Sequence, residues 1–430
     1  MRAKRFSSCA NAFFLLIVVL LLPILPVPAH AQTFTVLHTF EGTDGAEPVG
    51  VLVLDSAGNI YGTTGIGGGG TKCPNFSNSG CGSAFALNKA GREVGLHSFN
   101  GPNGAGPDAG LVRDAAGDFF GTTVGGGMNA KACGGTQGYG CGIAFRLTKT
   151  GKETMYEFKG TPDGSNPQAP LVEDPAGNLY GTTPGGGANQ LGAVFKIDTH
   201  GREAILYSFA GPPAGGSDGA FSYNGVIRDA AGNLYGVTFA GGMFGEGAVY
   251  ELNTAGEETL LHSFAGGSDG AQPDSALLLD TDGNLYGTTA NGGNGECGGT
   301  GCGVIFELSP QSGGGWTETV FYTFCSLSGC ADGKAPLGPL VRGSSGSLYG
   351  VTYFGGTPRD CNGDGCGVVF EVDKAGKETV LHSFTGGSDG AFPAAGLTID
   401  NSGNLYGTTE QGGAICYTSF TCGVVFKITP

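Results

Sequence analysis

Charge is scarce in this chain, and basic charge is the scarcer kind. Asp, Glu, Lys and Arg make up 13% of the 430 residues, below the quarter or so that is usual in globular proteins. The 21 Lys and Arg are outnumbered by 37 Asp and Glu, which leaves a formal net charge of −16. Nucleic acids and anionic lipid surfaces select basic patches, so we expect neither as a partner.

Long apolar runs are also lacking, with one exception at the N-terminus. Three basic residues within the first five positions precede an apolar stretch over residues 12–27, and Ala29-His30-Ala31 has the small-x-small pattern of a cleavage site. These features predict a signal peptide over residues 1–31. Because no second apolar segment follows, we expect a soluble protein, extracellular or periplasmic, with no membrane insertion once the signal peptide is removed.

Helical periodicity is missing as well, and a repeated motif takes its place. The motif Asn-Leu-Tyr-Gly-Thr-Thr, with small variations, returns seven times. The spacing of its aromatic residue runs from 51 residues, between Tyr235 and Tyr286, to 63, between Tyr286 and Tyr349. Repeats of this length build propellers, solenoids or arrays. The aromatic positions are Tyr61, Phe120, Tyr180, Tyr235, Tyr286, Tyr349 and Tyr406.

One repeat is consistent with a small sheet of four strands. In the fifth repeat, turn and loop residues, many of them glycine, separate four short apolar or alternating runs, which predicts an antiparallel meander. Seven such sheets arranged radially make a β-propeller, whereas a solenoid usually has shorter repeats and needs polar end caps. The runs cover residues 276–280, 285–289, 303–308 and 317–324.

The two ends of the repeat region favour a closed ring. Residues 34–40 have the sequence of a fourth strand with no first three before it, and residues 424–429 that of a third strand with no fourth after it. Pairing them would complete the last blade and remove two open sheet edges. We therefore predict an all-β fold over residues 32–430, a seven-bladed β-propeller of four-stranded antiparallel blades, closed by the N-terminal strand.

Twelve cysteines follow the predicted signal peptide and form six local pairs. Five pairs lie in the loops between the second and third strands, and only where that loop is long. An exported protein keeps disulfides, which restrict long loops, so we predict six disulfides. Zinc is the alternative, but the pairs lack zinc-ribbon spacing and nearby histidines. The pairs are Cys73/Cys81, Cys133/Cys141, Cys297/Cys302, Cys325/Cys330, Cys361/Cys366 and Cys416/Cys422.

Candidate ligand-binding residues lie in the loops between fourth and first strands. Six of these loops carry Asp-Gly, and strand order places them on the same face as the cysteine loops. Carboxylates around one mouth suit a cation or a sugar, whereas the alternative is ordinary turn chemistry, in which Asp-Gly is common. The six are Asp44, Asp163, Asp218, Asp269, Asp332 and Asp389.

One segment of the sixth repeat resembles a calcium loop. Oxygen-bearing side chains at alternate positions, a glycine and a glutamate at the twelfth position are typical of calcium binding. The flanking elements are a loop and a strand instead of helices, which favours a structural interpretation. Calcium is the single cofactor considered, with Asp360, Asn362, Asp364 and Glu371 as candidate ligands.

Two other patterns are interpreted as structural. The fourth strands carry His38, His97, His262 and His382 where other repeats have tyrosine, which indicates packing more than catalysis. Gly-x-Ser-x-Gly occurs three times, but in loops without the following helix that a nucleophile elbow needs. No catalytic residue is assigned.

The repeat resembles a known family. Gly-Asn-Leu-Tyr-Gly-Thr-Thr, a Gly-Gly run, Gly-Val-Val-Phe and Gly-x-Glu-x-x-Leu-x-Ser-Phe are similar to the GloVer tandem repeats of exported bacterial proteins, over essentially all of residues 32–430. This resemblance implies export and brings no activity, and the anchoring tail of other members is not found here. The Asp-x-x-Gly-Asn-x-Tyr core is also similar to streptogramin lyase repeats, whose histidine and metal arrangement has no counterpart here.

These observations favour a monomeric binding or scaffold module that recognises a protein or glycan on the cysteine-loop face. The repeats are symmetric and the variable loops gather on one face, as expected for recognition. The alternative is an extracellular lyase or glycan-active hydrolase with its site in the central channel, which needs one sector that differs from the other six. A purely structural envelope protein is a third possibility.

Overall fold

The structure is a computed structural model that describes residues 32–429 except 70–72, 74–78, 96, 129–132, 134–139, 149–150, 212–217, 294–296, 358–360 and 418–419. The predicted signal peptide, residues 1–31, lies outside this range. The described residues are strands and loops, with three short 3-10 helices: η1 (Cys297–Gly299), η2 (Ser328–Cys330) and η3 (Cys361–Gly363). No helix in this part of the chain has the length and apolar character needed to span a bilayer.

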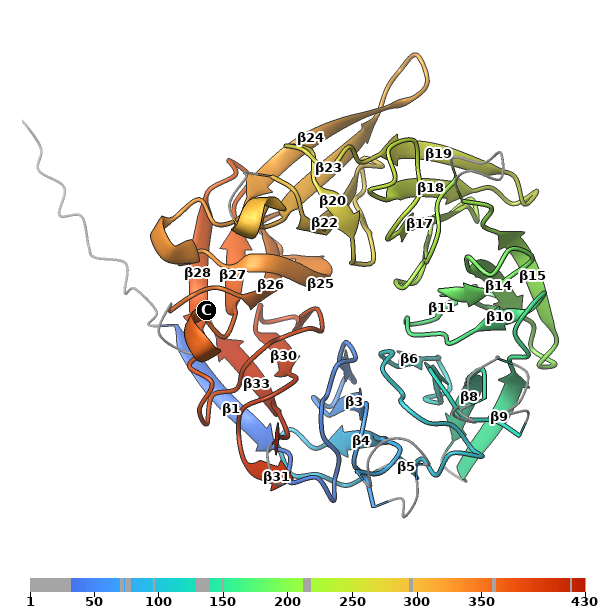
Figure 1. The fold of residues 1–430 in the computed structure, drawn as a ribbon. Helices are drawn as coiled ribbons and strands as arrows, with labels where there is room; N and C mark the ends of the chain where they lie inside the picture. Colours follow the sequence, from blue (N-terminus) through green and yellow to red (C-terminus); the bar gives the residue numbers. More distant parts are fainter. Residues whose placement is uncertain are drawn as a thin grey trace, which may run out of the picture. The chain divides into compact units, whose positions relative to one another are not determined.

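Seven antiparallel sheets, the blades, are arranged in a ring (Figure 1). From the inner to the outer strand, blade 1 contains β2 (Val53–Leu54), β3 (Ile60–Thr64), β4 (Ser83–Leu87) and β5 (His97–Ser98). Blade 2 contains β6 (Val112–Arg113), β7 (Phe119–Thr123), β8 (Ile143–Thr148) and β9 (Gly151–Glu157). Blade 3 contains β11 (Val172–Glu173), β12 (Leu179–Thr183), β14 (Ala193–Ile197) and β15 (Glu203–Ser208).

The next three blades repeat this order. Blade 4 contains β16 (Ile227–Arg228), β17 (Leu234–Thr238), β18 (Ala248–Leu252) and β19 (Glu258–Ser263). Blade 5 contains β21 (Leu278–Leu279), β22 (Leu285–Asn291), β23 (Val304–Pro310) and β24 (Trp316–Thr323), with β20 (Ala271–Pro273) also paired to β22. Blade 6 contains β25 (Lys334–Arg342), β26 (Leu348–Phe354), β27 (Val368–Val372) and β28 (Glu378–Ser383).

Blade 7 joins the two ends of the chain, as predicted. It contains β29 (Thr398–Ile399), β30 (Leu405–Thr409), β33 (Val424–Thr429) and β1 (Thr33–Thr39). Strand β1 pairs antiparallel with β33, from Thr33 opposite Thr429 to Thr39 opposite Val424. Two small pairs complete the strands: β10 (Gly164–Ser165) with β13 (Gly185–Gly186), and β31 (Ile415–Tyr417) with β32 (Phe420–Thr421). The predicted seven-bladed propeller and its closure are confirmed.

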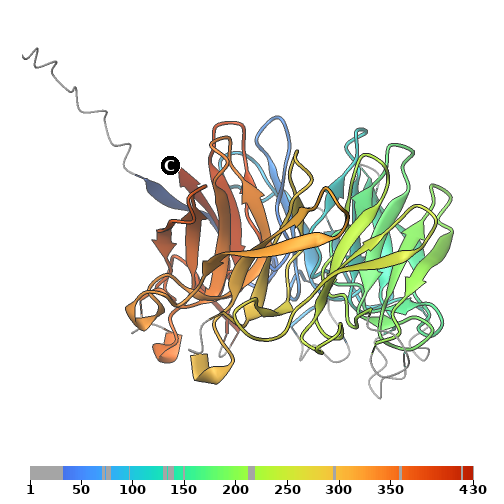
Figure 2. The same cartoon turned by 90° about the horizontal axis from the view of Figure 1, so that it is seen from above.

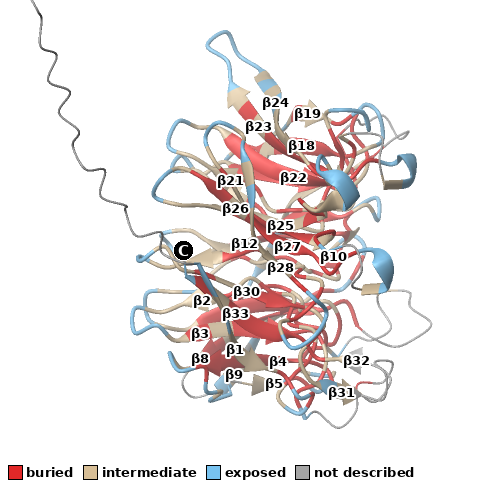
Figure 3. Ribbon diagram, turned by 90° about the vertical axis from the view of Figure 1, so that its left-hand side faces the viewer, coloured by how far each residue is buried: buried red, intermediate tan, exposed pale blue. Residues whose placement is uncertain are grey.

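Aromatic pairs connect each blade to the next. A phenylalanine directly after the outer strand of one blade meets the aromatic residue of the third strand of the next blade. All seven pairs have ring centroids 5.0–5.3 Å apart in tilted or edge-to-face arrangements, and all fourteen rings are buried (Figure 3). The pairs are Phe40/Phe85, Phe99/Phe145, Phe158/Phe195, Phe209/Tyr250, Phe264/Phe306, Phe324/Phe370 and Phe384/Phe426.

The same aromatic ring explains the glycine of the repeated motif. A Cβ added to Gly181 would lie 2.7 Å from the tip of the Phe195 ring, closer than real Cβ contacts. The equivalent glycine of every other blade meets its own third-strand aromatic residue in the same way. Because the ring occupies the place of a side chain, each motif needs glycine at this position.

The Asp-x-x-Gly-Asn turn and the motif tyrosine are partners. In blade 1, Asp55 accepts hydrogen bonds from the backbone N–H groups of Ala57 and Asn59 and from the Tyr61 hydroxyl, at 2.8–3.0 Å. Burial opposes ionisation of Asp55, but these hydrogen bonds outweigh it and lower the pKa of its carboxyl. Four other blades repeat the Asp–Tyr contact. The structural interpretation of this motif therefore holds.

The two faces of the ring differ. One face carries the loops between the second and third strands and those between an outer strand and the next inner strand; we call it the loop face. The opposite turn face carries the tight turns of the blades. All six predicted disulfides are formed, and all lie in loops of the loop face, where the three short helices also gather (Figure 2).

The disulfides of blades 1 and 2 also reach into the hydrophobic core. Cys81 pairs with Cys73, and Cys141 pairs with Cys133, as predicted. However, Cys81 is 0% exposed and Cys141 is 1% exposed, and each belongs to a cluster of buried apolar side chains between two blades. A disulfide sulfur carries no charge and can pack as an apolar group, and cysteine is among the residues most often fully buried.

This burial corrects the grouping of Cys81 and Cys141 with the residues of a functional site. The residue directly after each of them is the glycine that leads into the third strand, and this position places the sulfur beneath the loop. Neither sulfur is open to a ligand on the loop face. The two cysteines therefore anchor their loops to the core, and their role is structural.

Glutamates on four outer strands lie against the preceding blade. Burial raises the pKa of each carboxyl to about 7, and an aspartate of the preceding blade, such as Asp218 beside Glu258, raises it further. One oxygen of each is buried without a hydrogen-bond partner among the described residues. Lys152 and Phe34 occupy this position in blades 2 and 7. The four are Glu203, Glu258, Glu318 and Glu378.

These glutamates predict a stability that depends on pH. Their folded pKa values, about 7, lie above the model value of 4.5, so the stability they allow is complete below about pH 4.5 and is lost as the pH rises through 7. Changing all four to Gln is expected to raise the free energy of unfolding at pH 8 by about 1 kcal/mol per site, after discounting for screening, and to change it little at pH 4.5.

The measurement is urea unfolding at both pH values. Glu257→Gln, at an exposed position beside Glu258, is the matched control and should leave the pH dependence unchanged. An equal gain for the fourfold variant at both pH values would contradict this account.

Candidate functional site

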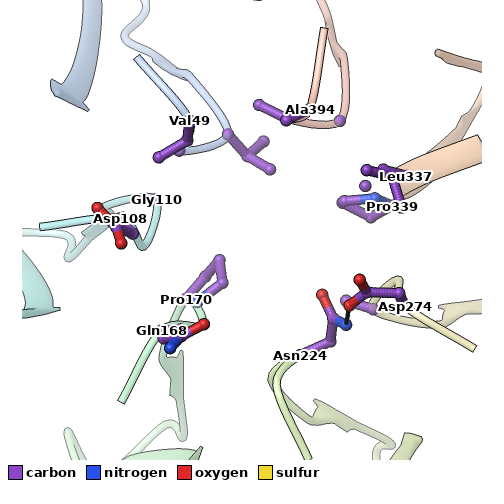
Figure 4. Close-up of a pocket in the computed structure, with 16 residues that line it drawn as sticks. Val49, Asp108, Gly110, Gln168, Pro170, Asn224, Asp274, Leu337, Pro339 and Ala394 are labelled. Atoms are coloured by element: carbon purple, nitrogen blue, oxygen red, sulfur yellow. Dashed lines mark hydrogen bonds between the residues drawn. The ribbon is translucent and has the colours of Figure 1, made fainter. Parts of the chain in front are cut away.

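A cavity of about 200 Å³ lies at the centre of the ring and is lined by residues from all seven blades. Figure 4 shows that its wall has two unlike halves. Blades 6, 7 and 1 contribute apolar side chains, and blades 2 to 5 contribute polar ones. The channel therefore breaks the symmetry of the repeats. The apolar residues include Val49, Leu337, Pro339 and Ala394, and the polar ones are Asp108, Gln168, Asn224 and Asp274.

Two aspartates in the polar half have raised pKa values. Asn224 donates a hydrogen bond to Asp274 at 2.7 Å, but burial outweighs it and raises the pKa of Asp274. Burial, with a smaller effect of Glu410, raises the pKa of Asp108 to about 6. A Cβ at Gly65 would lie 2.7 Å from Asp108 Oδ1, so glycine there allows the carboxyl its position.

More acidic side chains continue from Asp108 onto the loop face. Burial raises the pKa of Glu47 to about 7, with further contributions from the charges of Glu410 and Asp108. Burial also raises the pKa of Glu410, although the Tyr353 hydroxyl donates a hydrogen bond to it at 2.7 Å. We call Glu47, Asp108, Tyr353 and Glu410 the mouth cluster. It draws on four different blades and occupies one sector of the ring.

Aromatic rings accompany the mouth cluster. Tyr353 stacks on Phe392, with centroids 5.2 Å apart and an angle of 25° between the rings, and Phe354 meets Phe392 edge-on at 5.7 Å. Blade 4 carries a second group, in which Tyr223 contacts Phe221 at 6.5 Å and Phe239 at 5.6 Å. All six rings are partly exposed. They are called the mouth aromatics: Phe221, Tyr223, Phe239, Tyr353, Phe354 and Phe392.

A repeated backbone turn positions several of these side chains. The residue three places after each Asp-Gly aspartate, or after Asn103, has a positive φ, between 53° and 64°. In this conformation its N–H donates to a carbonyl of the preceding blade, for example Glu47 to Cys422 at 3.2 Å. The backbone is therefore fixed while the side chain varies, as is common at recognition positions. The seven residues are Glu47, Gly106, Asn166, Phe221, Gln272, Ala335 and Phe392.

The six aspartates predicted as ligands are distributed around the ring, one to a blade junction. Their carboxylates are engaged within their own loops: Asp218 accepts from the Tyr207 hydroxyl and from the N–H groups of Ala210 and Gly211, at 2.7–2.9 Å. Each lies against the His or Tyr of its outer strand, at 2.7–3.7 Å. Their role in ligand binding stays a prediction. They are Asp44, Asp163, Asp218, Asp269, Asp332 and Asp389.

The residues predicted to bind calcium have separate partners. Asp364 forms an ion pair with Lys334 at 2.8 Å, and Glu371 accepts a hydrogen bond from Tyr349 at 3.2 Å. Asn362 lies in η3 with a φ of 62°. Asp360 lies outside the described residues. The described residues thus leave calcium binding at this loop a prediction.

The mouth cluster does not belong to the residues that the repeats share, and sequence reasoning based on shared residues missed it. A signal for it existed in the positions that vary. Directly after Thr-Thr or its equivalent, Glu410 and Tyr353 stand where other repeats have Gly65, Val124, Pro184, Phe239 and Ala290. Comparing the repeats at this position identifies a sector that carries different chemistry.

The fold and channel define a seven-bladed β-propeller with an asymmetric central site. Residues 77–300 and 201–426 match the Gloeobacter/Verrucomicrobia repeat, and the chain belongs to this family, as its motifs predicted. No curated protein sequence matches it. The six disulfides and the family indicate an oxidising, extracellular or periplasmic location.

Solved structures with the same fold are distant in sequence. Selenomethionine-substituted virginiamycin B lyase from Staphylococcus aureus is 14% identical, with a TM-score of 0.54 over 93% of this chain and 99% of that one. The extracellular domain of a protein described as a one-component system of B. thetaiotaomicron is 14% identical, with a TM-score of 0.52 over 93% of this chain and 42% of that one. These similarities establish the fold alone.

Glu47→Gln is expected to stabilise the protein at pH 8 and to have little effect at pH 4.5. The folded pKa of Glu47, about 7, lies above the model value of 4.5, so the stability is complete below about pH 4.5 and lost as the pH rises through 7. After discounting for screening, the gain at pH 8 is about 1 kcal/mol. Thermal unfolding at both pH values measures it. Exposed Glu41→Gln is the control, and a wild-type-like melting temperature at pH 8 would contradict the prediction.

Proposed function

We propose that this propeller is an exported binding module that holds a glycan on its loop face, over the mouth of the central channel. The observation that carries the proposal is the combination of partly exposed aromatic rings and carboxyl groups at one mouth. Aromatic faces stack on the apolar faces of sugar rings, and carboxyl oxygens accept hydrogen bonds from sugar hydroxyls. Binding sites commonly combine such a majority of apolar surface with a few placed polar groups.

The distribution of exposed apolar side chains also supports the loop face. Among the described residues, six large apolar side chains are exposed, and five of them belong to loops of this face. Scattered exposed apolar residues are ordinary, but their gathering on one face is typical of interaction surfaces. A protein is the alternative ligand that they would suit. The five are Met128, Met243, Phe244, Leu327 and Ile415.

The test is binding of the folded, oxidised protein to an array of defined oligosaccharides, followed by titration of the best ligand. Tyr353→Ala and Phe239→Ala are expected to weaken binding at least tenfold, a loss of about 1.4 kcal/mol or more. Trp316→Ala is the matched control, because this partly exposed ring lies at a turn-face hairpin and should leave the affinity unchanged. No binding by folded wild type, or full binding by both mouth variants, would overturn the glycan proposal and favour a protein ligand.

Catalysis in the channel is the second candidate. The observation in its favour is the pair of raised carboxyl pKa values, about 7 for Glu47 and about 6 for Asp108, within one asymmetric sector. Such values suit a group that donates or accepts a proton near neutral pH, as a lyase or glycan hydrolase requires. Incubating the bound oligosaccharides with the protein and separating products by chromatography distinguishes the two. Cleavage that Glu47→Gln abolishes while binding persists would favour the enzyme.

Calcium binding by the blade 6 loop is tested separately. If the loop binds calcium, a saturable rise in melting temperature with calcium is expected, because the ion would bind the folded state only. Asp364→Ala should remove this rise, and Asp282→Ala, at the weaker turn pattern of blade 5, should keep it. A melting temperature that calcium and chelator both leave unchanged would end the calcium hypothesis.

A further inference from the structure

Two disulfides that are separate in the sequence lie side by side in the structure. Cys297–Cys302 closes the loop between β22 and β23, and Cys325–Cys330 closes the loop between β24 and β25. The four sulfur atoms all lie within 4.8 Å of one another. Among the described residues this is the one group of three or more Cys, His, Asp or Glu side chains that meets so closely.

We propose that these four cysteines form a tetrathiolate metal site for zinc when both disulfides are reduced. Zinc in structural sites is tetrahedral with Zn–S bonds of about 2.3 Å, which places ligand sulfurs about 3.8 Å apart. The sulfurs need only small shifts to reach that spacing. Each pair also has four residues between its cysteines, within the C-x2–4-C spacing of structural zinc sites.

The loop of the second pair has supports that do not involve sulfur. The buried carboxylate of Asp332 accepts hydrogen bonds from the N–H groups of Ser326 and Leu327, at 2.8 and 3.2 Å. The Cys325 N–H also donates to the Gly333 carbonyl at 3.1 Å. These contacts close the loop around residues 325–333, so both cysteines keep their places when the S–S bond is broken.

The loop of the first pair is held in a similar way. The Gly292 N–H donates to the Thr300 carbonyl at 2.8 Å, and the Thr300 hydroxyl donates to the Cys297 carbonyl at 3.1 Å. The Ala335 N–H donates to the Cys302 carbonyl at 2.9 Å and so links this loop to the start of blade 6. A site in which the scaffold already positions four sulfurs meets the main structural requirement for tight metal binding.

Another disulfide of the chain provides an internal contrast. Cys361–Cys366 closes the corresponding loop of blade 6, but the loop after β28 has Gly386 against it. A Cβ at Gly386 would lie 3.0 and 3.1 Å from the two sulfurs, so no second pair stands there. The loop after β24 is longer, with eight positions from Phe324 to Asp332 against five from Phe384 to Asp389, and the extra residues bring its two cysteines to the first pair.

The chemistry balances with a phosphine as reductant. Each of two phosphine molecules cleaves one disulfide, and water supplies the oxygen of the phosphine oxide and the two protons of the new thiols. The four thiols then lose four protons as their sulfurs bind one zinc ion. The metal would replace two bonds within loops by one joint between the loops that flank blades 5 and 6.

Cobalt(II) titration of the reduced protein tests the site. The protein is reduced with a phosphine under anaerobic conditions and its fold is checked by circular dichroism. We expect one cobalt ion per chain, with the visible absorption of tetrahedral cobalt thiolate, which one equivalent of zinc then abolishes. Cys297→Ser with Cys325→Ser should weaken binding at least a hundredfold and remove this spectrum. Cys361→Ser with Cys366→Ser is the matched control and should keep both.

Three outcomes would overturn the proposal. The first is a cobalt spectrum that Cys297→Ser with Cys325→Ser leaves unchanged, since the metal would then bind elsewhere. The second is the absence of tetrahedral absorption in reduced protein that keeps its circular dichroism. The third is loss of the fold on reduction in the presence of zinc, because the proposed site requires the loops to stay in place.

Discussion

The contact between neighbouring blades through pairs of aromatic rings is the constraint on which the rest of this structure depends. Each outer-strand phenylalanine meets the third-strand aromatic residue of the next blade, with centroids 5.0–5.3 Å apart. Such contacts add about 0.5–1.5 kcal/mol each to the burial of the rings. They need an empty position beneath the ring, which the motif glycine provides. Since β1 supplies Phe40 to blade 1, the closure by the N-terminal strand completes the seventh contact.

A ring held in this way leaves its loops free to differ. The inner positions before each first strand have one backbone conformation in all seven blades, with a positive φ and a hydrogen bond to the preceding blade. The side chains at these positions range from Ala335 to Glu47 and Phe392. The repeated backbone thus fixes where side chains stand, and the local sequence decides which chemistry stands there. Acidic groups gather in one sector of the mouth, and aromatic rings flank it.

Much of the fold could be predicted because its signals are local and repeated. Strand lengths, turn chemistry, the pairing of neighbouring cysteines and the complementary ends of the chain all lie within one repeat or at its boundaries. The candidate site could be predicted less well. The conspicuous Asp-Gly aspartates satisfy their own loops, as Asp218 does with Ala210 and Gly211. Glu47, Asp108 and Glu410 belong to three different blades, and neither composition nor periodicity relates them.

The sequence by itself determined the number of blades, their strand order, the closure and the six disulfide partners, because each depends on residues close in the chain or on a pattern repeated seven times. Only the tertiary structure decided which singular residues meet and which cysteines, such as Cys81 and Cys141, are buried in the core. Ring closure brings Glu47 to Glu410, 363 positions away, and the junction of blades 5 and 6 brings Cys297 and Cys302 to Cys325 and Cys330. Those meetings depend on how the blades are placed around the ring, and no single repeat contains that information.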